Sequence, residues 1–136
     1  MTVEEIKETF SLFTDWEDKY RYIIELGKEL PELSEEDKTE QNLIRGCQSQ
    51  VWLVYEIGSD KHIRLSIDSD AHIVRGLIAI VLASLNHKTA SQIIDFDVES
   101  LFKELQLLEH LSPTRGNGLR AMVGQIKSVA ESALLS

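Results

Sequence analysis

The feature that most constrains the fold is a pair of alternating segments in the middle of the chain, separated by a turn sequence. Apolar residues occupy every second position over residues 51–57 and again over 63–67, which is the period of a β-strand with one buried face. The intervening Gly58-Ser59-Asp60 is typical of a tight turn. This pattern predicts an antiparallel hairpin whose apolar face needs a covering layer from the rest of the chain.

Helical segments on both sides of the hairpin are suited to that role. Apolar residues recur at spacings of three and four in residues 3–13, 16–30, 73–85, 98–108 and 119–133. The predicted N-caps of the helices are Asp15, Thr89, Asp97 and Ser112. We therefore expect an α+β fold in which a small antiparallel β-sheet packs against a layer of α-helices, in a single domain over residues 1–136.

The composition limits the partners and the location. The 14 basic and 23 acidic residues give a formal charge of -9, which repels the phosphate backbone, so we expect no nucleic-acid partner. No apolar run approaches the roughly 18 residues that a membrane span requires. The start MTVEEIKETF lacks the basic and apolar regions of an export signal. We expect a cytoplasmic protein that does not bind membranes.

The chain has one cysteine, Cys47. A single thiol cannot form an internal disulfide, a redox pair or a thiolate-based zinc site. Gly46 before it and the polar Gln48-Ser49-Gln50 after it predict a tight loop between two strands, with the sulfur at the end of the sheet. The alternative is a structural cysteine that acts as a small buried hydrophobe.

Other candidate residues are fewer and less specific. The four histidines, His62, His72, His87 and His110, lack the spacing of metal ligands, so no metal site is assigned. A Cys-His-Asp hydrolase built from Cys47, His72 and either Asp68 or Asp70 is an alternative that sequence distance does not exclude.

Two further stretches precede predicted helices. Asp68-Ser69-Asp70 favours N-capping of the helix over 73–85, and its acidic pair is also suited to docking a partner. Arg115 lies in the first turn of the last helix with Gly116 and Gly118, and glycines are poor helix formers. Close approach of another backbone segment is one reason for such glycines, and it would bring the Arg115 guanidinium near that segment; the alternative is a plain surface arginine.

Four runs of sequence together resemble the SufE family of sulfur-acceptor proteins. They are WEDKYRYIIELGKELPEL (16–33), NLIRGCQSQVWL (42–53), DSDAHIVRGLIA (68–79) and HLSPTRGNGL (110–119). GCQSQVW is the most specific of these motifs, and it is more similar to SufE than to the paralogue CsdE. The resemblance covers nearly the whole chain and implies a SufE/IscU-like version of the α+β fold.

The resemblance also implies a function and partners. The partner would be the cysteine desulfurase SufS, whose cofactor is pyridoxal phosphate, while this chain would have no cofactor and would not act as an enzyme alone. Cys47 matches the family's persulfide acceptor, which passes sulfur to the SufBCD scaffold for iron-sulfur cluster assembly and stimulates the desulfurase. Gly46, Gln48, Asp70 and Arg115 become candidates for shaping the loop, stabilising the persulfide or docking the partner. A homodimer remains open.

A carrier of this kind explains the single thiol. A second nearby cysteine would attack the persulfide and expel its sulfur. We expect Val51, Trp52 and the helix over 73–85 to form an apolar pocket that raises the pKa of the Cys47 thiol, and we expect the Gly46 loop to swing out when the partner docks. The alternatives that remain are the cysteine hydrolase and an interaction module with a structural cysteine.

Overall fold

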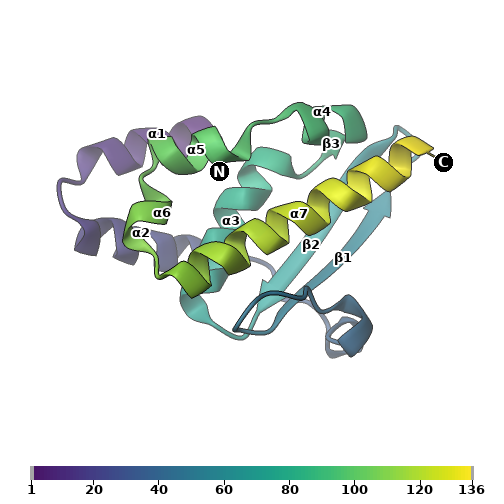
Figure 1. Ribbon diagram of the computed structural model, residues 1–136, viewed down its shortest axis with the longest axis horizontal. Coiled ribbons are helices and arrows are strands. Elements are labelled where there is room, and N and C mark those ends of the chain that lie inside the picture. Colours follow the sequence, from purple (N-terminus) through teal and green to yellow (C-terminus); the bar gives the residue numbers. More distant parts are fainter. Residues whose placement is uncertain (1, 136) are drawn as a thin grey trace.

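The described part of the chain, residues 2–135 of this computed structural model, contains seven α-helices and one three-stranded antiparallel sheet (Figure 1). This is the predicted α+β architecture. The helices are α1 (Val3–Leu12), α2 (Trp16–Lys28), α3 (His72–Leu85), α4 (Ala90–Asp95), α5 (Val98–Glu104), α6 (Leu107–His110) and α7 (Pro113–Leu135). The strands are β1 (Val51–Ile57), β2 (His62–Ser69) and β3 (Lys88–Thr89), and the short 3-10 helices η1 (Glu35–Asp37) and η2 (Glu40–Asn42) precede β1.

The sheet has the order β1-β2-β3. Strands β1 and β2 form the predicted antiparallel hairpin, in a register that runs from Val51 opposite Ser69 to Ile57 opposite Ile63. The short β3 pairs with the other edge of β2. This third strand was not predicted, because two residues are too few to show an alternating pattern.

Helix α3 packs on the inner face of the hairpin, where Ile63, Leu65 and Ile67 are buried. Nine residues of α3 are buried, in agreement with the broad apolar face predicted over 73–85. Burying one large aliphatic side chain contributes about 1.5–3 kcal/mol, so this interface is a main source of stability.

Helices α2 and α3 cross where each has a glycine. A Cβ atom on Gly27 would lie 2.6 Å from the backbone nitrogen of Gly76, and a Cβ atom on Gly76 would overlap the Ile23 carbonyl. No other residue type fits at either position without moving a helix. The crossing fixes α2 against α3 on the side opposite the hairpin.

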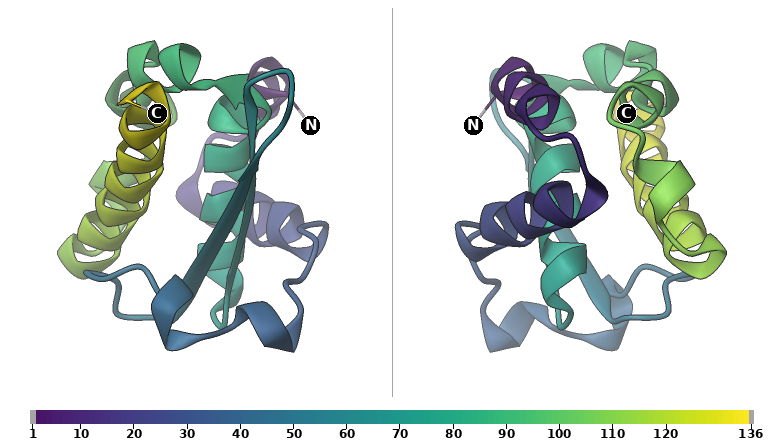
Figure 2. Two further views of the ribbon diagram at one scale, coloured as in Figure 1. Left: turned by 90° about the vertical axis from the view of Figure 1, so that its right-hand side faces the viewer. Right: turned by 90° about the vertical axis from the view of Figure 1, so that its left-hand side faces the viewer.

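Helix α7 forms the other side of the molecule (Figure 2). Its predicted stripe is largely confirmed: the buried members include Leu119, Met122 and Ile126. The Lys127 ammonium group donates to the carbonyls of Ile93 and Phe96 at 2.8 and 2.7 Å, which satisfies the C-terminal end of α4. In both views the segment before β1 reaches across to the N-terminal part of α7.

The helix predicted over 98–108 is divided in two. It ends at Glu104, and a new helix, α6, begins at Leu107. Gln106 between them has φ = 57°, a left-handed conformation that interrupts helical hydrogen bonding. The continuous-helix prediction was wrong because Leu105 and Leu107 are both buried, and one unbroken helix does not place both on one face.

The N-caps predicted at Asp15, Thr89 and Asp97 are confirmed, and the capping predicted for α3 is not. Asp15, Thr89 and Asp97 each accept a hydrogen bond from the backbone three residues later. The predicted capping of α3 by Asp68-Ser69-Asp70 is wrong, since the N-cap is Ala71 and no side chain caps that helix. The three polar residues instead make contacts at the end of β2.

Candidate functional site

The loop that contains Cys47 spans residues 45–50 and connects the isolated β-bridge at Leu43 to the start of β1. Leu43 forms an isolated antiparallel bridge with Trp52, and the Ile44 amide donates to the Val51 carbonyl at 2.8 Å. The predicted loop between two strands is therefore confirmed on its C-terminal side, where β1 begins. On its N-terminal side there is no strand, only the bridge at Leu43. The loop leaves the sheet at its end, as expected.

Gly46 turns the loop toward α7. Its φ is +93°, a conformation that side chains disfavour. A Cβ atom at this position would also lie 3.2 Å from the Cβ atom of Ala121 on α7. The backbone conformation therefore favours glycine, and the neighbouring helix leaves little room for a side chain.

Cys47 is half-buried and points at α7. Its Sγ donates a hydrogen bond to the Gly118 carbonyl at 3.4 Å. Burial raises the pKa of the Cys47 thiol, in the direction expected from the sequence. The thiol is therefore protonated near neutral pH, and it is a weak nucleophile as long as it stays in this position.

A cavity of about 40 Å³ lies beside the thiol. Because a cavity needs about 10–15 Å³ to hold one water molecule, this space admits an atom the size of sulfur. Its lining comes from the loop, β1, α3 and α7: Cys47, Gln48, Ser49, Val51, Val74, Leu77, Thr114, Arg115, Gly118, Leu119 and Met122. The site combines a thiol, apolar side chains and one cationic side chain.

Trp52 does not line this cavity, contrary to expectation. Successive residues of a strand point to opposite faces, so Val51 faces the cavity and Trp52 faces away. The Trp52 ring instead lies under the Lys38 ammonium group, 5.6 Å from the ring centroid. The segment that contains η1 and η2 thus covers the outer face of β1 at this end.

Arg115 and Gly118 place α7 against the loop. The Arg115 amide donates to the Ser112 hydroxyl at 3.2 Å, so Ser112 caps α7 as predicted. Because α7 begins at Pro113, Arg115 lies in its first turn, beside the cavity. A Cβ atom on Gly118 would lie 3.6 Å from Cys47 Sγ, which is ordinary contact distance but would occupy space beside the sulfur.

The end of β2 holds the C-terminal end of the loop. The Gln50 amide donates to the Asp70 carboxylate at 3.1 Å, and the Asp70 amide donates to the Gln50 carbonyl at 3.3 Å. The Ser69 hydroxyl donates to the same carbonyl at 2.7 Å. Asp70, a candidate for docking or capping, therefore makes contact with the base of the Cys47 loop.

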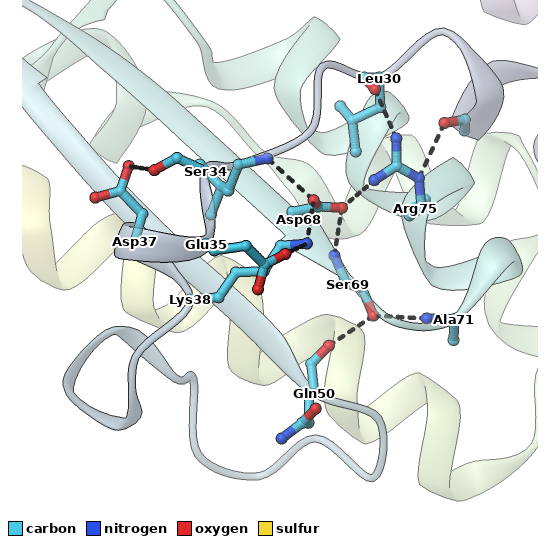
Figure 3. A network of polar contacts seen from close by, with 12 residues as sticks. Leu30, Ser34, Glu35, Asp37, Lys38, Gln50, Asp68, Ser69, Ala71 and Arg75 are labelled. Carbon is cyan, nitrogen blue, oxygen red and sulfur yellow. Dashed lines mark hydrogen bonds and ion pairs between the residues drawn. The ribbon is translucent and has the colours of Figure 1, made fainter.

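A buried polar network adjoins these contacts (Figure 3). Asp68 is 1% exposed, forms an ion pair with Arg75 and accepts from the Leu33 amide at 3.1 Å. Arg75 also donates to the Leu30 carbonyl at 2.6 Å, just beyond the end of α2. The Lys38 ammonium group lies 3.8 Å from Asp68 Oδ2, the oxygen that does not contact Arg75. Sequence reasoning missed this network, although an acid at a strand end with a basic residue in the first turn of the next helix was a usable signal.

The hydrolase alternative lacks a base beside the nucleophile. The sulfur's hydrogen bond goes to a backbone carbonyl, and within residues 2–135 no histidine lines the cavity. His72 is exposed, Asp68 is engaged by Arg75, and the Asp70 carboxylate accepts from the Gln50 amide. Cys47, His72 and either aspartate are thus not arranged as a catalytic triad.

Two kinds of feature are absent from the described residues. No group of three histidine, cysteine, aspartate or glutamate side chains in residues 2–135 could hold a metal ion. None of the helices in that part of the chain combines the length and apolar character needed to cross a membrane.

The fold is shared with a solved protein of low sequence similarity. The solution structure of a hypothetical protein from Thermus thermophilus superposes with a TM-score of 0.78, and the match covers 100% of both chains at 17% identity. That likeness concerns the fold alone.

The family is shown by closer matches. The chain matches the family model described as SufE, Fe-S metabolism associated domain, over residues 4–130. An uncharacterized SufE-like protein of Rhizobium meliloti (strain 1021) is 48% identical over 136 residues, covering 98% of this chain and 97% of its own. A second, from Rhizobium etli, is 49% identical over 133 residues, with 96% and 90% covered. The chain belongs to the SufE family, as the motifs predicted, and has a role in Fe-S metabolism.

Proposed function

We propose that this protein accepts sulfane sulfur on Cys47 from the persulfide of a cysteine desulfurase and passes it to an iron-sulfur cluster assembly scaffold. The observation that carries the proposal is the lone thiol, half-buried in a small cavity beside Arg115, on a loop at the end of the sheet. Membership of the SufE family supports the same role.

The transfer is a thiol-persulfide exchange that balances without an added oxidant or reductant. Cys47 loses its proton and its thiolate attacks the terminal sulfur of the donor persulfide. A sulfur-sulfur bond forms on Cys47 as the donor's sulfur-sulfur bond breaks, and the donor cysteine leaves as a thiolate that takes up a proton. The sulfane sulfur keeps its oxidation state, so the chain needs no cofactor of its own for this step. Pyridoxal phosphate would belong to the desulfurase.

The cavity protects the Cys47 thiol before transfer and the Cys47 persulfide after it. Burial raises the thiol pKa, so unwanted reactions with small electrophiles are slow. A half-buried sulfur cannot reach a second protein's cysteine, so the loop must move outward on docking, with Gly46 able to absorb the backbone change. Once loaded, the terminal sulfur returns to the cavity, where the Arg115 guanidinium stabilises the persulfide anion.

Docking involves the exposed rim of the loop. Gln48 is exposed at the mouth of the cavity and offers an amide to the partner. By removing sulfur from the desulfurase, the chain frees that enzyme's cysteine for another cycle, which accounts for stimulation of its turnover.

Intact mass spectrometry tests the proposal directly. The chain is incubated with a cysteine desulfurase and free cysteine, and we expect a mass gain of one sulfur atom that a reductant removes. The matched control is Cys47→Ser, which should gain nothing. A wild-type chain that gains no sulfur under conditions in which the desulfurase itself is loaded would refute the acceptor role.

A further inference from the structure

The two ends of the Cys47 loop are held differently. At the first end, the Ile44 amide bonds to the Val51 carbonyl, which is a contact between backbones. At the second end, a side chain takes part, since the Ser69 hydroxyl donates to the Gln50 carbonyl at 2.7 Å. The second end is therefore sensitive to which residue stands at position 69.

Ser69 makes this contact from a buried position. It is 6% exposed, so water competes little for its hydrogen bonds. The same hydroxyl accepts from the Ala71 amide at 3.2 Å, and Ala71 is the N-cap of α3. One hydroxyl group thus connects Gln50 to the start of the helix that contributes Val74 to the cavity.

Ser69 is itself held by the buried network (Figure 3). Its amide donates to Asp68 at 2.8 Å, and the same carboxylate oxygen is bound by Arg75. Ser69 cannot shift without disturbing a buried ion pair, which is costly. Asp70 also binds Gln50, through its backbone amide at 3.3 Å and through its exposed carboxylate at 3.1 Å.

We infer that Ser69 is a positioning residue for sulfur transfer: it fixes Gln50, so that only residues 45–49 move and the Cys47 sulfur returns to the same cavity after each transfer. This inference rests on the proposed function for its purpose, but the positioning itself is a property of the isolated chain. Ser69 acts on Cys47 through the loop and does not touch the sulfur.

The test compares two buried serines. Ser69→Ala removes the bond to Gln50, whereas Ser84→Ala is a matched control, because Ser84 is 2% exposed and its hydroxyl bonds within its own helix, to Val81, at 2.8 Å. The measured quantity is the rate of Cys47 alkylation by iodoacetamide as a function of pH, without any partner.

We expect Ser69→Ala to raise the alkylation rate near neutral pH roughly two- to tenfold, the factor that loss of one ordinary hydrogen bond produces. The apparent thiol pKa should fall at the same time, because a less buried thiol ionises more easily. Ser84→Ala should leave both quantities at the wild-type value, and Ser69→Thr, which keeps the hydroxyl, should restore them. A Ser69→Ala profile identical to wild type overturns the inference.

Hydrogen exchange of the wild-type chain gives a second test that needs no variant. The Ala71 amide donates to the Ser69 hydroxyl, so it should exchange more slowly than the amides of 46–49 if that hydroxyl is fixed between Gln50 and α3. Equal rates for Ala71 and Gly46 would overturn the inference even if Ser69→Ala failed to fold.

These measurements separate the inference from the proposed function. Alkylation and exchange use the chain alone, so they can succeed even if the mass experiment shows no sulfur acceptance. If acceptance does occur, sulfur loaded on Ser69→Ala should be lost to a small thiol several-fold faster than from the wild type or from Ser84→Ala.

Discussion

The Cys47 thiol donates a hydrogen bond to the Gly118 carbonyl, across a sequence separation of 71 residues. The bond joins the loop before β1 to α7 at the cavity. A thiol is a weak donor, so the contact orients the sulfur without holding the loop strongly. The loop can therefore leave α7 at a low cost in free energy.

Cys47→Ser and Cys47→Ala should separate sulfur chemistry from loop anchoring. Both remove the thiol, so both should lose sulfur acceptance, while thermal stability stays close to wild type because the residue lies on a half-buried loop. Serine retains a donor for the Gly118 carbonyl and alanine does not. Hydrogen exchange of residues 45–49 should therefore be faster in the alanine variant. Undiminished stimulation of a desulfurase by Cys47→Ser would show that Cys47 is not the acceptor.

The stability of the protein should fall at alkaline pH because of Cys47. Burial raises the thiol pKa in the folded state, so between the unfolded value, about 8.5, and the higher folded value the native state holds more protons than the unfolded state. The stabilisation from this group is present below the unfolded pKa and is lost as pH rises through the folded one. Urea unfolding across this range should show a loss that is smaller in Cys47→Ser. An equal loss in both proteins would assign the effect to other groups.

Arg115→Ala should slow sulfur loading without changing the fold. A hydrogen bond to a charged group is worth about 1.5–3 kcal/mol, so we expect loading to slow by roughly tenfold or more, with Arg115→Lys recovering part of the rate. Arg120→Ala is the matched control, because Arg120 lies on the same helix but pairs with Glu99. Single-turnover loading followed by mass spectrometry measures the effect. Equal rates for the two alanine variants would make Arg115 an ordinary surface residue.

Gly46→Ala should destabilise the protein, and Gly124→Ala should not. Gly46 has φ = +93° and Ala121 nearby, so alanine is strained there by about 1–2 kcal/mol. Gly124 is exposed within α7 and a Cβ atom there meets nothing within 4 Å, so alanine should stabilise the helix by up to about 1 kcal/mol. Denaturant unfolding compares the two. A neutral Gly46→Ala would mean that the loop readily adopts another conformation.

Local patterns in the sequence determined the hairpin, most helix starts and the position of the thiol. An alternating segment, a turn sequence or an N-cap acts over a few residues, so it can be read without knowing what packs against it. Gly46 next to Cys47 is such a signal, and its left-handed conformation agrees with the expected loop.

Only the tertiary structure decided which distant residues meet. The break at Gln106, the turning of Trp52 away from the cavity and the Asp68-Arg75 pair all depend on contacts between separate segments. The clearest case is the DSD sequence at 68–70, where helix capping was the reasonable local interpretation. Instead, Asp68 pairs with Arg75, while Ser69 and Asp70 bind the backbone of Gln50. A buried carboxylate or hydroxyl must hydrogen-bond to the partners that the packed chain brings within reach, and these cannot be known from the local sequence.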